Sequence, residues 1–154
     1  MILKDIHASY GRYGNSNMYI STLDEVLEHQ RSNGIVQSAV VNNLSAKADV
    51  RECNDQLLKE SSNRSEIVPA LSLFPPSFSA ESYTKNELAS IIDNTGNLFF
   101  KLFPKEHHIL LTSWQFGWMI DMIEESNCSI LVALDDIDLR DLAQIKAERP
   151  ELRI

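Results

Sequence analysis

His7 is the residue whose position in the chain most strongly suggests chemistry. It stands where the apolar run Ile2–Ile6 stops, ahead of a loop rich in Tyr, Gly and Asn. An imidazole at a strand end can ligate a divalent metal or act as an acid or base near neutral pH. Residues two apart on a strand point the same way, and the place of a second histidine ligand is taken by Ser9. His7 is therefore half of a working metal site, the remnant of one, or a histidine that is hydrogen-bonded at a strand end.

Lys101 is the second residue with a chemical interpretation, because it lies inside the apolar run Leu98–Phe103. An amine within such a run is costly to bury unless it is paired. Alternation along a strand places it on one face with Phe99 and Phe103. We expect Lys101 to bind an anionic substrate or to orient a metal-binding carboxylate. The alternative is an amine that reaches the end of the sheet or pairs with an acid.

Acids and histidines also follow the later apolar runs. Asp135, Asp136 and Asp138 come after the fifth run, where carboxylates can bind a cation. Asp138 is better explained as the N-cap of a helix. The adjacent His107 and His108 cannot easily face one target, and we predict that they lie in a surface loop.

Composition narrows the class of protein. The 154 residues are 44% hydrophobic, with only five Gly and five Pro, which favours one packed domain spanning residues 1–154. A net charge of -8 argues against nucleic acid or an anionic membrane as the main partner, because both require basic patches. No apolar run approaches the roughly 20 residues that span a bilayer, no signal peptide is evident, and the two cysteines have no metal-ligand spacing. We expect a cytoplasmic protein.

Buried strands and amphipathic helices alternate along the chain. Continuous apolar runs predict five strands of a parallel sheet, and a sixth is expected to begin at Leu152–Ile154. The five strands are predicted at Ile2–Ile6, Ile35–Val41, Ile67–Phe74, Leu98–Phe103 and Ser129–Leu134. Capping boxes at Thr22–Glu25 and Thr84–Glu87 predict helix starts, and Gly34 predicts the end of the first helix. Ser113 and Asp138 are predicted to cap two later helices.

This order predicts an α/β fold of parallel βα repeats with right-handed crossovers. One architecture is a partial or truncated TIM-barrel-like fold, since a complete eight-fold barrel needs at least about 200 residues. The other is a flavodoxin-like open sheet. In both, function lies at the carboxyl ends of the strands. A barrel interrupted after five and a half strands has two open edges, which favours association into a homo-oligomer.

Six segments carry a resemblance that runs along nearly the whole chain. They are Asp5–Ser9, Thr22–Val41, Asn54–Leu58, Ile67–Pro75, Gly96–Pro104 and Leu142–Ile154. Their order and spacing resemble the amidohydrolase-related family of metal-dependent βα-barrel hydrolases and decarboxylases. In that family the first segment reads Asp-x-His-x-His and the fifth reads Gly-x-Lys-Leu-His-Pro, so Ser9 and Phe103 stand at histidine positions of this chain.

The resemblance implies a barrel of which this chain spans the N-terminal five to six strands. It also implies a metal held by two first-strand histidines, by histidines after strands five and six, and by an aspartate after strand eight. Of these ligands the chain supplies only His7, because Ser9 replaces the second and the fifth strand ends in Ala133 and Leu134. Catalytic zinc usually has three protein ligands and an open water position.

We therefore predict hydrolase or decarboxylase ancestry with an incomplete, degenerate metal site. The implied cofactor is zinc or manganese, with His7 as a ligand and Lys101 orienting a small-molecule substrate or the metal. One alternative is a non-catalytic binding or assembly module that kept the fold. Another is an unrelated small α/β binding domain.

Overall fold

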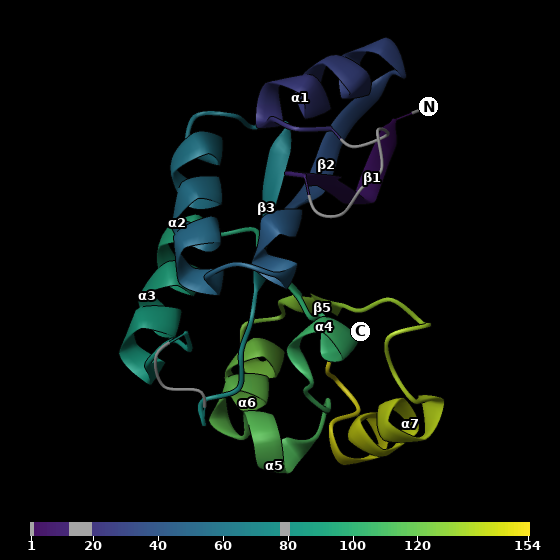
Figure 1. The fold of residues 1–154 in the computed structure, drawn as a ribbon. Helices are drawn as coiled ribbons and strands as arrows, with labels where there is room; N and C mark the ends of the chain where they lie inside the picture. Colours follow the sequence, from purple (N-terminus) through teal and green to yellow (C-terminus); the bar gives the residue numbers. More distant parts are fainter. Residues whose placement is uncertain (1, 13–19, 78–80) are drawn as a thin grey trace. The chain divides into compact units, whose positions relative to one another are not determined.

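The structure, a computed structural model, describes residues 2–12, 20–77 and 81–154 and divides into two compact units, Met1–Ser72 and Leu73–Ile154. The first unit contains β1 (Leu3–Tyr10), α1 (Leu23–Ser32), β2 (Ile35–Asn42), the 3-10 helix η1 (Asn43–Ala46), α2 (Val50–Ser61) and β3 (Ile67–Ser72) (Figure 1). The second contains α3 (Lys85–Thr95), β4 (Phe99–Lys101), α4 (Pro104–His107), α5 (Ser113–Phe116), α6 (Trp118–Glu125), β5 (Ser129–Leu131) and α7 (Leu139–Glu148). The predicted α/β fold of parallel βα repeats is confirmed.

The first unit is built on three parallel strands. β2 lies between β1 and β3, and both pairings are parallel. This sequential order is the one found in βα barrels, and it differs from the flavodoxin-like order in which β1 lies between β2 and β3. Helix α1 contacts β1 and β2, while α2 contacts β2 and β3, as Figure 1 shows. Each helix thus covers the strands that it connects.

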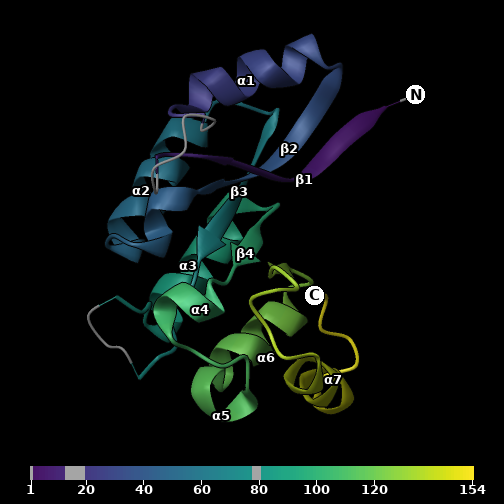
Figure 2. The ribbon, with the colours of Figure 1, turned by 45° about the vertical axis from the view of Figure 1, so that its right-hand side comes forward.

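The second unit contains the parallel pair of β4 and β5, in which Lys101 stands opposite Leu131. Strand β4 and the short helix α4 that follows it can be traced in Figure 2. An isolated parallel bridge joins Ser129 to Arg153, and the Ile130 amide donates to the Arg153 carbonyl over 2.8 Å. This bridge lies within the predicted start of a sixth strand.

Strand β1 is longer than its apolar run suggests. The prediction that it ends at Ile6 is wrong, because pairing with β2 continues to Tyr10. The register shifts twice on the way, between Leu3 and Lys4 and again further along, where Asp5 pairs with Ser38 but Ala8 pairs with Val40. Three steps along β1 therefore match two steps along β2, which is the mark of a β-bulge. The later strands are shorter than predicted, since β3 ends at Ser72 and β5 at Leu131.

Local sequence signals set the helix boundaries. Both predicted capping boxes form, Thr22 with Glu25 and Thr84 with Glu87. Gly34 has a φ of +68° just after α1, as expected for a glycine that ends a helix. The prediction for Ser113 is wrong: it is the first residue of α5 rather than a cap, and its hydroxyl donates to Glu148 instead.

The core consists of apolar side chains from both kinds of element. In the first unit, strands and α2 bury Val40, Val50, Leu57 and Leu71. In the second, β4 and the helices bury Leu88, Phe100, Phe116, Met119, Ile120 and Ile123. Both cysteines are buried and unpaired with each other. Within the described ranges, no helix has the length and apolar character needed to cross a membrane.

The second capping box provides a test of how much local capping stabilises the protein. We expect Thr84→Ala to lower the free energy of unfolding by about 1 kcal/mol, because the Glu87 amide and the Glu87 carboxylate both lose the Thr84 hydroxyl. Chemical denaturation followed by circular dichroism measures the change. Ser90→Ala, on the exposed face of the same helix, is the control, and an equal loss there would contradict the capping explanation.

Candidate functional site

The centre of the candidate site is the amine of Lys101, in the second unit. Lys101 is the last residue of β4, and its carbonyl accepts a hydrogen bond from the Leu73 amide over 3.1 Å. The residue is only 4% exposed, although it carries a charge. Burial lowers the pKa of this amine below its usual range because the charged form loses water. The apolar run Leu98–Phe103 predicted Lys101 inside a strand, whereas in the structure it is the last residue of β4.

Three carboxylates surround the amine at a distance. Asp136, then Glu106 and Asp135, act against the effect of burial on the Lys101 pKa and favour the charged form. In the part of the chain that the structure describes, no carboxylate lies within 4 Å of the Lys101 amine. The side chain of Asp136 instead pairs with Lys105, with 3.7 Å between Nζ and Oδ1. Lys101 therefore does not form the close ion pair that the sequence left open.

Aromatic rings occupy the space beside the amine. The Lys101 nitrogen lies 5.3 Å from the centre of the Phe103 ring, within the range of a cation–π contact. The imidazole of His107 meets the edge of the same Phe103 ring at 5.6 Å and stacks on Phe74 at 4.3 Å. Lys101, Phe103, His107 and Phe74 thus form one contiguous cluster, which we call the Lys101 cluster.

The location of His107 was not anticipated. The prediction of a surface loop is wrong for His107, which ends helix α4 and packs against the two phenylalanine rings. The Nδ1 atom of His107 is buried. The sequence signal for this helix is Pro104, because proline is favoured at the first position of a helix. The helix turns His107 back over Phe103, whose carbonyl accepts from the His107 amide. His108 follows with a φ of +53° and is exposed.

The acids after β5 have separate roles. Asp138 caps α7, as predicted: it accepts from the Arg140 amide over 2.8 Å and pairs with the Arg140 guanidinium. These hydrogen bonds lower the pKa of Asp138. Asp136 pairs with Lys105 and so links the loop after β5 to α4. Of the three acids after β5, Asp135 and Asp136 act on the Lys101 amine.

His7 belongs to the first unit, where its surroundings differ from the expected metal site. It is an exposed residue within β1 rather than at the end of the strand, and its amide donates to Asp5 Oδ1 over 2.9 Å. The hydroxyl of Ser9 accepts from Asn43 Nδ2 over 3.0 Å. The expectation that His7 and Ser9 share a face rests on unbroken alternation, and the bulge between Asp5 and Ala8 interrupts it.

The residues present do not fit the zinc or manganese that the resemblance implies. In residues 2–12, 20–77 and 81–154, no three His, Cys, Asp or Glu side chains come together in a way that could hold a metal ion. Oδ1 of Asp5, the acid nearest in sequence to His7, accepts a hydrogen bond from a main-chain amide. A catalytic zinc usually needs three protein ligands.

The Lys101 cluster can act as an anion-binding site. An ammonium group offers three hydrogen-bond donors to an oxygen acceptor. The remote acids favour the charged form of the amine, and among the described residues none of them lies within 4 Å of it. The chemistry that this arrangement supports is therefore binding of an oxygen acceptor, such as a carboxylate, beside an aromatic ring. Comparisons with protein-family models, curated proteins and solved structures found no match to this chain.

Proposed function

We propose that this chain is an amidohydrolase-related βα-repeat protein that binds a small carboxylate through Lys101, without metal-dependent hydrolysis or decarboxylation. The observation that carries the proposal is the buried Lys101 amine, which has no carboxylate within 4 Å among the described residues. It lies at the carboxyl end of a parallel strand, the edge where βα proteins place their ligands.

Two further features support a carboxylate ligand. The acids Asp136, Glu106 and Asp135 favour the charged form of the Lys101 amine, which is the form that a carboxylate binds. Phe103 stands where the family has a histidine, and its ring places an apolar surface beside the amine. Such a surface suits the carbon skeleton of a small organic acid better than it suits a metal ion.

The first test is carboxylate binding by the whole chain and by Lys101→Met. Isothermal titration with acetate, malonate and benzoate measures the dissociation constants. We expect at least one of these acids to bind, and Lys101→Met to weaken that binding at least tenfold, because a charge-assisted hydrogen bond is lost. Lys105→Met is the matched control: it removes an exposed lysine that pairs with Asp136, and binding should change by no more than about threefold.

Equal binding by the wild-type chain and Lys101→Met would overturn the proposal, as would the absence of binding by all three acids. A second measurement addresses the metal. After incubation with zinc or manganese and desalting, we expect no one-to-one metal content that depends on His7. A stoichiometric metal that His7→Ala abolishes would contradict the non-metal part of the proposal and favour a metal-dependent hydrolase or decarboxylase.

A further inference from the structure

Lys101 differs in burial from every other lysine of the chain. All the lysines fall within the described ranges, and among them Lys101 alone is buried. Lys146 is half-buried, and its amine donates to the Pro150 and Leu152 carbonyls over 2.7 Å and 2.6 Å. The remaining lysines are exposed: Lys4, Lys47, Lys59, Lys85 and Lys105. The Lys101 amine has no hydrogen-bond acceptor of the kind that Lys146 has among the described residues.

The Lys101 nitrogen is nevertheless open to solvent. It is not one of the described side-chain atoms that are sealed from water and also lack a hydrogen-bond partner. Because the amine makes no hydrogen bond to a described residue, its nitrogen must keep some contact with water. A small molecule can therefore approach the nitrogen from the side that water reaches, although the rest of the side chain is buried.

An amine in these surroundings has the properties of a nucleophile. Burial lowers the pKa of Lys101, so near neutral pH a larger share of this amine is neutral than of an exposed lysine. Only the neutral amine carries the lone pair that attacks a carbonyl carbon, and desolvation is one way in which proteins activate lysines. No carboxylate within 4 Å, among the described residues, engages the amine in an ion pair.

We propose that the Lys101 amine condenses with a small apolar aldehyde to form an imine. The nitrogen lone pair attacks the carbonyl carbon, and one nitrogen proton passes to the carbonyl oxygen, which gives a carbinolamine. The hydroxyl group then leaves with the second nitrogen proton as water, and the nitrogen lone pair forms the C=N bond. Atoms and electrons balance without an oxidant or a reductant.

An apolar aldehyde is the class of carbonyl compound that suits this nitrogen. The Phe103 ring, whose centre lies 5.3 Å from the nitrogen, offers an apolar surface for a short carbon chain. The inference goes beyond carboxylate binding, but it rests on the same access to the Lys101 nitrogen as the proposed function. A carboxylate binds the ammonium form of Lys101, whereas an aldehyde reacts with the neutral form.

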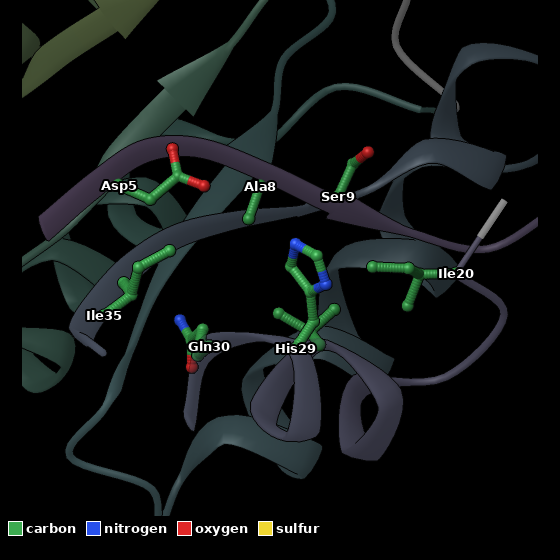
Figure 3. A pocket seen from close by; sticks show the side chains of 8 residues that line it. Asp5, Ala8, Ser9, Ile20, His29, Gln30 and Ile35 are labelled. Atoms are coloured by element: carbon green, nitrogen blue, oxygen red, sulfur yellow. The ribbon is translucent and has the colours of Figure 1, made fainter. Parts of the chain in front are cut away.

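The cavity of the first unit does not offer a second place for this reaction. It has a volume of about 230 Å³ and lies between α1 and β1, where Figure 3 shows His29 extending from the helix toward Ala8 of the strand. No lysine is among the described residues that line it. An aldehyde held in this cavity therefore meets no lysine amine in its wall.

The probe is acetaldehyde, with sodium cyanoborohydride present to reduce each imine to a stable ethylamine. The whole chain is labelled briefly at neutral pH with limiting aldehyde, and peptide mapping by mass spectrometry measures the extent of labelling at each lysine. We expect Lys101 to be labelled about tenfold faster than the exposed Lys59 and Lys105, because more of its amine is neutral. In concentrated urea this preference should disappear, since unfolding gives all lysines the same solvent.

Labelling of Lys101 that is no faster than labelling of Lys59 would overturn the inference. A preference for Lys101 that persists in urea would also overturn it, because the preference would then come from the local sequence rather than from burial. Failure of this inference can be told apart from failure of the proposed function. Carboxylate binding without preferential labelling of Lys101 rejects the imine and keeps the proposed function, whereas preferential labelling without carboxylate binding rejects the proposed function and keeps the imine.

Discussion

Replacement of Asn54 by alanine is expected to destabilise the first unit by about 2–4 kcal/mol, the largest loss that we predict for a polar residue. Asn54 lies in α2, is 2% exposed, and pairs with the main chain of Ser72 at the end of β3. Its Nδ2 donates to the Ser72 carbonyl over 2.8 Å, and its Oδ1 accepts from the Ser72 amide over 2.9 Å. Alanine would leave both main-chain groups buried without these partners.

The expected loss corresponds to a decrease in melting temperature of roughly 4–16 °C for a chain of this size. Differential scanning calorimetry measures the decrease, and hydrogen exchange should show that the Ser72 amide loses protection in Asn54→Ala. Asn94→Ala, on the exposed side of α3, is the control, and we expect a change within about 0.5 kcal/mol there. A similarly small effect of Asn54→Ala would show that the Asn54 amide does not hold the end of β3.

The second large effect is a gain in stability on replacing Lys101 with methionine. Methionine has a similar length and carries no charge, so it removes the cost of burying the amine beside Phe103. We expect the free energy of unfolding to rise by about 1–2 kcal/mol near neutral pH, the lower part of the range for replacing buried ionic groups with apolar ones. A residue that binds a ligand at the expense of stability is expected to behave in this way.

The pH dependence of that gain follows from the direction of the pKa shift. The pKa of Lys101 is lowered by burial in the folded protein from its ordinary value of 10.5. Below the lowered pKa, both folded and unfolded chains carry the proton, and the full cost of burial is present. Between the lowered pKa and 10.5, the folded chain binds fewer protons than the unfolded one, so its stability rises with pH. The advantage of Lys101→Met should therefore shrink as the pH approaches 10.5.

Urea denaturation of the wild type and Lys101→Met at a series of pH values between 7 and about 10.5 measures this difference. Other groups that titrate in the range are common to both proteins and cancel in the comparison. Lys105→Met should show no such trend, because Lys105 is largely exposed. A Lys101→Met variant that is less stable than the wild type at pH 7 would mean that the amine has a partner that compensates for its burial.

Local patterns in the sequence predicted most of the elements. The capping boxes of Thr22 and Thr84 depend on hydrogen bonds within three residues, so their sequence signature is sufficient to place them. The apolar runs predicted every strand and the parallel arrangement for the same reason, since a strand covered on both faces needs apolar residues throughout. The length of β1 was not predictable, because Ile6–Tyr10 is held in a strand by its pairing with β2 rather than by its own composition.

For the candidate site, too, some features follow from the local sequence and others only from the tertiary structure. The sequence by itself determined that a lysine, Lys101, stands within an apolar strand. Only the tertiary structure decided that the Lys101 amine lies beside Phe103, with no carboxylate within 4 Å of it among the described residues. The physical reason is that hydrogen bonds and ion pairs are made between residues far apart in the chain, whereas helical and strand periodicity is a property of neighbours.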